Sequence, residues 1–339
     1  MNGKLLSIFG LALGLGLSAG SAFAQDKVTL ATNWRAQPSH GGFYQALADG
    51  TYKKYGLDVT IQQGGPQVNN RPMLPAGRVD FLMAGNMLLP FDNLKAGVPT
   101  LVVAAYFQKD PQILIAHPGQ GYEKFADLTK APTVLLSKDG QISFFQWMKK
   151  AYGFRDEQLR PYNFSLSQFL ADKKSVQQGY ATSEPISVQA QAGFKPLVFS
   201  LADAGWSTYG MVIETRKDLV EKKPDVVRRF VEASNIGWYN YLYGDRSGAD
   251  KLIRETNPDI TADYTDQSIA ILRDHIDTGD ALTDGIGAVK AERVLDFYKK
   301  AVEAGIFTPG QINPEASFTT QFVNKGVGLD VRKQLTAGK

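Results

Sequence analysis

The chain has 339 residues, a formal charge of only +3 and no cysteine. So small a charge gives no reason to expect binding to nucleic acid or to an acidic membrane surface. The absence of cysteine excludes disulfides, thiolate metal sites, a cysteine nucleophile and a lipid-modified N-terminal cysteine. Because 43% of the residues are apolar, the sequence can bury a large core, and we expect a folded protein rather than a disordered one.

The N-terminus predicts export. Lys4 precedes an apolar run over residues 5–17, and Ala22-Phe23-Ala24 offers a cleavage site. This is the pattern of a secretory signal peptide, which we assign to residues 1–24 with cleavage after Ala24. No later apolar run is long enough to span a membrane, so we expect no span in the mature form. Without a lipid anchor, an outer membrane would have to retain the exported protein, and we therefore expect a periplasmic location.

The mature chain begins with short apolar segments that alternate with helical patterns. The expected strands cover residues 28–31, 57–61, 79–83 and 100–105, and a helix is expected after the Gly64-Gly65-Pro66 break, up to Ala76. Strands that alternate with helices in this way predict an α/β fold with a parallel sheet and helices on both faces.

The pattern restarts after Asp110-Pro111, which predicts a second lobe. The expected strands there cover residues 113–116, 133–136, 162–164, 180–182 and 197–199, and residues 211–213 are expected to return to the first sheet. We therefore assign residues 25–112 and 208–339 to lobe 1 and residues 113–207 to lobe 2.

The C-terminal part is predicted to be helical. Pro224 suits the first turn of a helix. Seven residues after it share one face at helical spacing and are expected to be buried: Val227, Phe230, Val231, Ser234, Trp238, Tyr241 and Leu242.

The sequence contains no recognisable catalytic or metal-binding motif. Its three histidines, His40, His117 and His275, lie far apart, and none has a metal-ligand spacing. No nucleophile elbow or phosphate-binding glycine loop occurs in the mature chain. We therefore expect no enzymatic activity, no metal and no cofactor.

Several segments resemble one family: Asn33-Trp34, His40-Gly41-Gly42-Phe43-Tyr44, Tyr55-Gly56-Leu57-Asp58-Val59, Gly77-Arg78-Val79-Asp80 and residues 223–230. This family groups thiamin-pyrimidine-precursor-binding proteins with fungal pyrimidine synthases, and the alkanesulfonate- and nitrate-binding proteins are more distant. The resemblance implies a two-lobed type II periplasmic-binding-protein fold whose interlobe cleft closes like a hinge. It also implies a monomer that binds a small molecule and delivers it to an inner-membrane ABC permease with its ATPase.

The residues do not match the enzymatic branch of this family. That branch carries a cofactor-binding lysine and a sacrificial histidine just after the Val-Asp strand, where this chain has Ala84 and Leu88. It also carries a cysteine-rich iron-binding run, and this chain has no cysteine. The resemblance therefore implies a binding protein.

Candidate site residues follow from the rule that ligands bind beyond the carboxyl ends of strands in open α/β sheets. Trp34 and Tyr44 offer flat faces, Asn86 and Glu184 offer hydrogen-bond partners, and His40, Gly65, Ser137 and Tyr209 complete the set. Six of the eight also have a structural alternative: lobe packing for Trp34, a helix end for His40, Asn86 and Glu184, a turn for Gly65, and hinge packing for Tyr209.

The expected ligand is a thiamin-related pyrimidine or a similar small heteroaromatic. Trp34 and Glu184 are expected to face each other across the cleft, with the ring stacked on Trp34 and its amino group bound by Glu184. A sulfonate or another small organic anion is the alternative ligand, because the helix start at Ser137 offers backbone amides. A periplasmic sensor subunit would have the same fold and is the alternative role.

Overall fold

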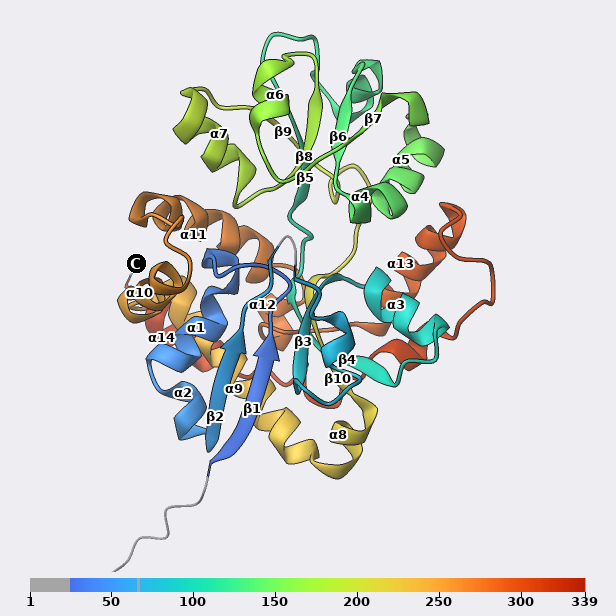
Figure 1. Cartoon of the computed structure of the whole chain (residues 1–339). Helices are drawn as coiled ribbons and strands as arrows, with labels where there is room; N and C mark the ends of the chain where they lie inside the picture. The colour runs from blue at the N-terminus through green and yellow to red at the C-terminus, as the bar shows by residue number, and fades with distance from the viewer. Residues whose placement is uncertain (1–24, 66–67, 339) are drawn as a thin grey trace, which may run out of the picture.

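The computed structural model describes residues 25–65 and 68–338, and it consists of two lobes, each built on its own five-stranded sheet (Figure 1). The predicted signal peptide lies outside the described residues. Among those residues, every helix is too short or too polar to cross a membrane.

The first sheet has the strand order β2-β1-β3-β10-β4. Its strands are β1 (Asp26–Ala31), β2 (Leu57–Gln62), β3 (Phe81–Asn86), β4 (Thr100–Phe107) and β10 (Gly210–Arg216). The second sheet has the order β7-β6-β8-β5-β9. Its strands are β5 (Gln112–Ala116), β6 (Val134–Leu136), β7 (Leu159–Pro161), β8 (Val176–Tyr180) and β9 (Leu197–Ser200).

The chain passes between the two sheets twice. The first crossover joins β4 to β5, and the second joins β9 to β10. Each sheet is mixed, which corrects the expected parallel arrangement: β10 runs antiparallel to β3 and β4, and β5 runs antiparallel to β8 and β9. The reversed strand in each lobe is the one that a crossover leads into.

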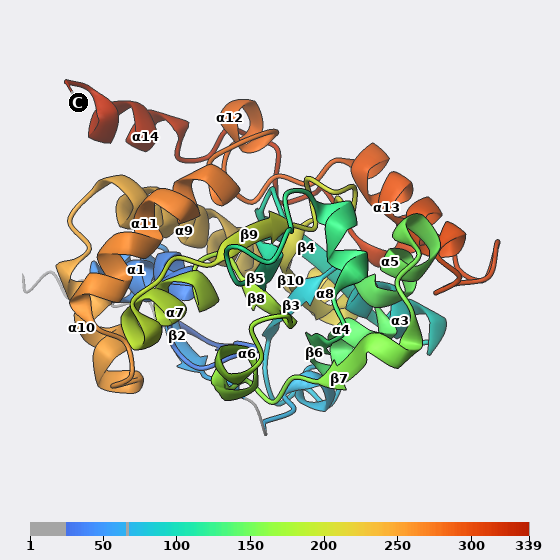
Figure 2. The same ribbon diagram turned by 90° about the horizontal axis from the view of Figure 1, so that it is seen from above.

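In the part of the chain that the structure describes, ten α-helices surround the first sheet (Figures 1 and 2). They are α1 (Gly41–Ala48), α2 (Thr51–Lys54), α3 (Leu88–Lys95), α8 (Lys217–Lys222), α9 (Pro224–Tyr243), α10 (Ser247–Thr256), α11 (Ala262–Ile276), α12 (Ala281–Asp284), α13 (Ala291–Glu303) and α14 (Leu329–Thr336). Helix α9 begins at Pro224 as predicted, and all seven residues of its predicted apolar face are buried.

Four helices cover the second sheet: α4 (Lys138–Ile142), α5 (Phe144–Tyr152), α6 (Ser167–Ala171) and α7 (Glu184–Ala192). Seen along the length of the molecule, α5 of lobe 2 lies beside α13 of lobe 1 (Figure 2).

Three local expectations need correction. The helix expected up to Ala76 is reduced to a single 3-10 turn at Arg71–Met73. Strand β7 ends at Pro161 rather than continuing to Phe164, whose backbone has a positive φ of 64° and cannot extend a strand. Strand β8 ends at Tyr180, where a strand was expected to start, because Gln177, Gln178 and Gly179 pair with β5 despite their polar character.

Candidate functional site

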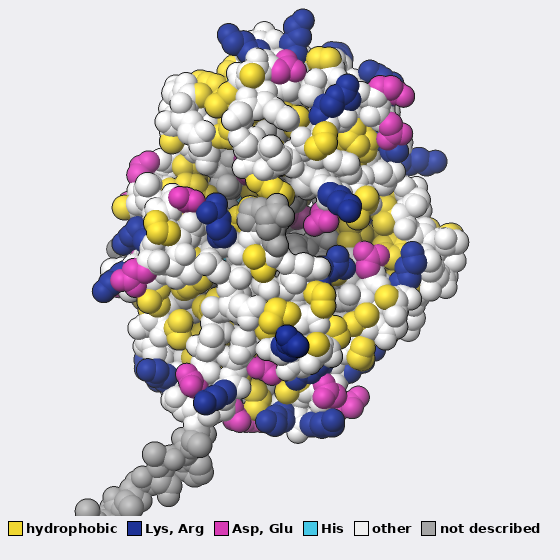
Figure 3. Space-filling view, in the orientation of Figure 1, with side chains coloured by type: hydrophobic (Ala, Val, Ile, Leu, Met, Phe, Trp, Pro, Cys, Tyr) yellow, Lys and Arg dark blue, Asp and Glu magenta, His cyan; other side chains and the backbone are white. Residues whose placement is uncertain are grey.

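The loops that the sequence selected meet where the two lobes face each other. Strands β1 and β2 point toward lobe 2, and α4 lies at the edge of lobe 2 that faces lobe 1 (Figure 1). In the space-filling view, apolar, basic and acidic side chains lie around this junction on the front of the molecule (Figure 3). We call this region the cleft.

Two aromatic rings meet across the cleft. Trp34, in the loop after β1, is half-buried, and its ring centroid lies 4.8 Å from that of Phe164, in the loop after β7, with 48° between the ring planes. Because Phe164 remains 46% exposed, the pair offers accessible aromatic faces from both lobes.

The backbone of Phe164 adds a second sign of a functional site. A positive φ is unusual for a bulky residue and costs free energy of about 1–3 kcal/mol. Strain of this kind persists only where the surroundings impose it, and it concentrates at binding sites. The sequence predicted Phe164 as the last residue of a strand. It gave no sign of the positive φ, because no glycine marks a turn at this position.

Glu184 lies behind this pair of rings, at the first residue of α7. Its Oε1 accepts a hydrogen bond from the Tyr162 hydroxyl at 2.9 Å, and its Oε2 accepts one from the backbone N–H of Tyr180 at 2.6 Å. The ring of Tyr162 lies 5.2 Å from that of Phe164. A continuous series of contacts thus links Trp34 to Glu184 through Phe164 and Tyr162, two residues that the sequence did not single out.

The charge of Glu184 is not balanced by a salt bridge within the described residues. Burial raises the pKa of its carboxyl above the ordinary value, and the hydrogen bonds from Tyr180 and Tyr162 act in the opposite direction. A ligand that brings a hydrogen-bond donor or a positive charge would therefore find a partly buried acceptor that is hydrogen-bonded but has no salt-bridge partner among the described residues.

Three further predicted residues lie at the same junction. Gly65 follows β2, and a Cβ there would have room, whereas a Cβ at the adjacent Gly64 would lie 2.5 Å from the backbone oxygen of Thr32. Asn86 ends β3 and accepts a hydrogen bond from the N–H of Leu88 at 2.9 Å. Ser137 caps α4 by accepting from the N–H of Gly140 at 3.1 Å.

His40 and Tyr44 are placed in the core instead. His40 is 1% exposed and Tyr44 is 3% exposed. Burial lowers the pKa of His40 to about 3, so its ring is neutral near pH 7. Burial raises the pKa of Tyr44 to about 12, and its hydroxyl lies near Thr256 of α10. His40 thus follows its structural alternative, a place at the end of a helix, and Tyr44 is buried within α1.

Tyr209 lies at the hinge. It is 1% exposed, its hydroxyl donates to Asp280 Oδ2 at 3.1 Å and accepts from the N–H of Lys290 at 2.9 Å, and the guanidinium of Arg293 covers its ring at 4.0 Å. All of its polar capacity is used within the protein, so the structure places Tyr209 in hinge packing.

Asp110, in the first crossover, is a buried carboxyl that the sequence did not single out. It is 1% exposed; Oδ1 accepts from the N–H of Gln112 at 3.1 Å, and Oδ2 has no hydrogen-bond partner among the described residues. Burial raises the pKa of this carboxyl to about 7.

Replacing Asp110 with asparagine should raise the free energy of unfolding near pH 8 and change it much less near pH 4. The folded chain holds the proton of Asp110 up to a pKa of about 7, whereas the ordinary value is 3.8. Between these values the unfolded chain binds fewer protons, so this group makes wild-type stability fall as the pH rises. Asparagine cannot ionise, so the variant avoids this loss of stability as the pH rises. Its side-chain oxygen can still accept the hydrogen bond from the N–H of Gln112.

Denaturant unfolding at both pH values measures this difference, and Asp58→Asn on the exposed part of β2 is the control. A stability gain of Asp110→Asn that is equal at the two pH values would contradict the assignment of a neutral buried carboxyl.

Within residues 25–65 and 68–338, no three His, Asp or Glu side chains are gathered in a group that could hold a metal ion. The predicted site residues that lie at the cleft bring together aromatic, amide and hydroxyl groups and the carboxylate of Glu184, and further basic and acidic side chains surround them (Figure 3).

Solved structures confirm the fold. The aliphatic sulphonate binding protein SsuA from Escherichia coli is 14% identical, with a TM-score of 0.64 over 86% of this chain and 91% of its own. The nitrate-binding protein NrtA from Synechocystis is 12% identical, with a TM-score of 0.57 over 93% and 90%. The desulfurization enzyme DszB is also 12% identical, with a TM-score of 0.59 over 90% and 100%. The architecture is thus the two-lobed periplasmic-binding-protein fold.

No curated protein sequence matches the chain. The family described as NMT1/THI5 like matches residues 37–245, which include α1, the whole second sheet and all of α9. The match covers more than half of the chain and includes the segments around Gly42, Leu57 and Pro224, which carry the resemblance. The protein belongs to the NMT1/THI5-like family.

Proposed function

We propose that this chain is the solute-binding component of an ABC importer and that its ligand is a small heteroaromatic of the thiamin-related pyrimidine type. The proposal includes export with cleavage after Ala24, a periplasmic location, a monomer, and delivery of the ligand to a permease with its ATPase. It assigns residues 25–112 and 208–339 to lobe 1 and residues 113–207 to lobe 2. Binding, rather than catalysis, is the proposed activity.

The contact between Trp34 and Phe164 is the observation that carries this proposal. The two rings come from different lobes and touch each other, so a flat ligand that lies against the exposed parts of both rings would contact both lobes at once. Such a ligand would stabilise the closed arrangement over an open one, which is what ligand-driven closure requires. The polarizable faces of aromatic rings favour flat, conjugated ligands over flexible chains.

Glu184 narrows the chemistry of the ligand. A carboxylate without a salt bridge accepts hydrogen bonds from an amino group on a heterocycle and disfavours a nearby anion. A sulfonate or another small organic anion is the second candidate, because two of the similar structures are described as sulphonate- and nitrate-binding proteins. A sensor subunit would use the same cleft, and the genes beside this one would distinguish that role.

A thermal-shift screen of the purified protein tests the proposal. The compounds are amino-bearing pyrimidines, thiamin, alkanesulfonates and nitrate. A ligand present at a hundred times its dissociation constant should stabilise the protein by about 2.7 kcal/mol, which raises Tm by a few degrees. Stabilisation by a pyrimidine supports the proposal, and stabilisation by sulfonates alone would replace the proposed ligand with an anion.

Replacing Glu184 with glutamine should weaken binding of an amino-bearing heterocycle about tenfold or more, because a hydrogen bond to a charged group contributes about 1.5–3 kcal/mol. The amide can still accept from the N–H of Tyr180 and donate to the Tyr162 hydroxyl, so the local structure is kept. Calorimetric titration measures the change.

Tyr162→Phe is the matched control, since it removes a partner of Glu184 and leaves the carboxylate in place. It should change affinity by less than about threefold. Tighter binding by Glu184→Gln would show that the ligand is an anion.

A further inference from the structure

A short loop in the second crossover lies between helices of the two lobes. We call residues 201–206, which follow β9, the hinge loop. The N–H of Leu201 donates to the backbone oxygen of Gln112 at 3.1 Å, and the N–H of Trp206 donates to the backbone oxygen of Leu201 at 2.8 Å. These two bonds close the loop on itself and fix it at the start of β5.

Helix α5 of lobe 2 holds one side of the hinge loop. The hydroxyl of Tyr152 donates to the backbone oxygen of Ala204 at 2.6 Å. The ring of Trp147 lies 5.5 Å from that of Trp206, which is fully buried.

Helix α13 of lobe 1 holds the other side. The ammonium of Lys300 donates to the backbone oxygen of Gly205. The ring of Phe297, one turn earlier, meets the ring of Trp206 edge-on at 5.0 Å. Trp206 is therefore packed between an aromatic residue of each lobe.

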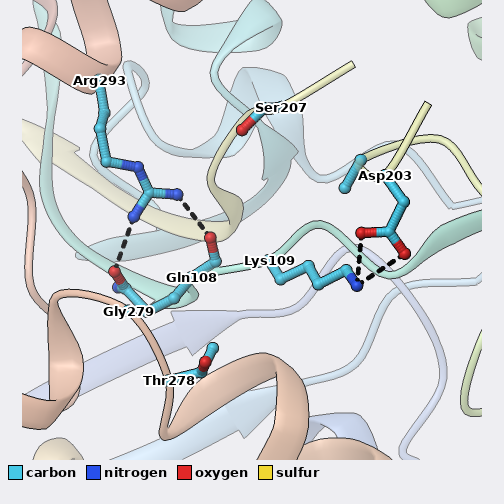
Figure 4. Close-up of a pocket in the computed structure, with 8 residues that line it drawn as sticks. Gln108, Lys109, Asp203, Ser207, Thr278, Gly279 and Arg293 are labelled. Carbon is cyan, nitrogen blue, oxygen red and sulfur yellow. Dashed lines mark hydrogen bonds and ion pairs between the residues drawn. The ribbon is translucent and has the colours of Figure 1, made fainter. Parts of the chain in front are cut away.

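The same helix also holds the first crossover. Arg293 donates to the backbone oxygen of Gln108 at 2.6 Å and to its side-chain oxygen at 3.1 Å (Figure 4). Next to it, Lys109 donates to Asp203 of the hinge loop at 2.8 Å, which joins the two crossovers (Figure 4). A pocket of about 370 Å³ lies between these groups.

We propose that the hinge loop is a two-sided latch that holds the lobes in the closed arrangement, with Tyr152 as the tie to lobe 2 and Lys300 as the tie to lobe 1. Ala204 and Gly205 are adjacent residues, and neighbouring Cα atoms are only about 3.8 Å apart. The loop has little slack, so α5 cannot move away from α13 by more than a few ångströms while both bonds remain. Opening must break one of the two ties.

The two ties act in series. Cutting either one breaks the hydrogen-bonded connection between α5 and α13 and leaves only the ring contacts of Trp206, so cutting the second adds little. Each single replacement, Lys300→Met or Tyr152→Phe, should therefore raise the ratio of open to closed molecules about threefold to tenfold, and the double replacement should give nearly the same ratio. Neither residue is part of the cleft.

Distance measurement between two spin labels tests this in the ligand-free protein. The sequence has no cysteine, so Lys53→Cys in lobe 1 and Lys173→Cys in lobe 2, both at exposed positions, give a single labelled pair. We expect Lys300→Met to add a population at a different distance, and Lys300→Arg, which keeps a donor, to restore the wild-type distribution.

Lys299→Met, at an exposed position of the same helix, is the matched control and should leave the distribution unchanged. Far-UV circular dichroism confirms that each variant is folded. A wild-type distribution in Lys300→Met would overturn the latch, and so would a double variant whose population ratio changes by the product of the two single effects.

Discussion

Replacing Trp34 with alanine should weaken binding of the best ligand by about tenfold to a hundredfold. Stacking of a flat ring on an aromatic side chain contributes about 1–3 kcal/mol when it is measured by truncation. The replacement also removes the contact with Phe164, and with it the link between the lobes that the ligand would strengthen. Phe164→Ala should have an effect of similar size, since that ring is the other half of the pair. Calorimetric titration of both variants measures the loss.

Phe194→Ala is the matched control for these truncations. Phe194 is also a half-buried aromatic residue, but its ring stacks on His117 within lobe 2, at 4.9 Å. We expect this variant to bind like the wild type. Wild-type affinity in Trp34→Ala would assign Trp34 to lobe packing and would remove the basis for an aromatic ligand.

Replacing Gly237 with alanine should lower the free energy of unfolding by about 3 kcal/mol, at the upper end of the usual cost of overpacking a core. A Cβ at this position of α9 would lie 2.3 Å from the backbone oxygen of Gly42 and 2.7 Å from the Cβ of Ala46. Both neighbours belong to α1, so the helices must separate to make room. The better helix propensity of alanine returns only about 1 kcal/mol.

Denaturant unfolding compares this variant with Gly248→Ala in α10. Gly248 is exposed, and a Cβ there would meet only the methyl group of Ala48, at 3.3 Å. Its replacement should change stability by less than about 1 kcal/mol in either direction. Equal stability of Gly237→Ala and the wild type would show that α1 and α9 are less closely packed than we describe.

The alternation of apolar and polar residues predicted the positions of helices and strands more accurately than the pairing of the strands. The apolar face of α9 is periodic over five turns, and burial follows directly from such a pattern. Strand direction is a different matter. Whether β5 runs parallel or antiparallel to β8 depends on contacts between residues that lie sixty or more positions apart, and a local pattern carries no information about them.

The most distinctive motif, His40-Gly41-Gly42-Phe43-Tyr44, turns out to serve packing. A Cβ at Gly41 would lie 2.0 Å from the ring of Tyr241, and one at Gly42 would lie 2.2 Å from the ring of Trp238. The two glycines let α1 approach α9 closely, and His40 and Tyr44 are buried with them. The motif therefore identifies the fold and carries little information about the ligand, which explains why two residues predicted from it lie in the core.

The rule that ligands bind in the loops after strands predicted cleft residues more accurately than this motif did. Trp34 and Glu184 were selected because they follow strands, and the structure places both at the junction of the lobes. Phe164 and Tyr162 connect them, and they could not be inferred because the positive φ of Phe164 depends on its tertiary surroundings. In the sequence, Asp110 only marked the boundary between the lobes. Its burial could not be inferred, because it arises only when both crossovers are in place.

A crystal structure of the protein with the compound that stabilises it most tests the central claim most directly. We predict that the ring of the compound lies against Trp34 and Phe164 and that one of its N–H groups donates to Glu184. A compound bound in the pocket beside Arg293, or held in the cleft by an anionic group without contact to either ring, would contradict this account.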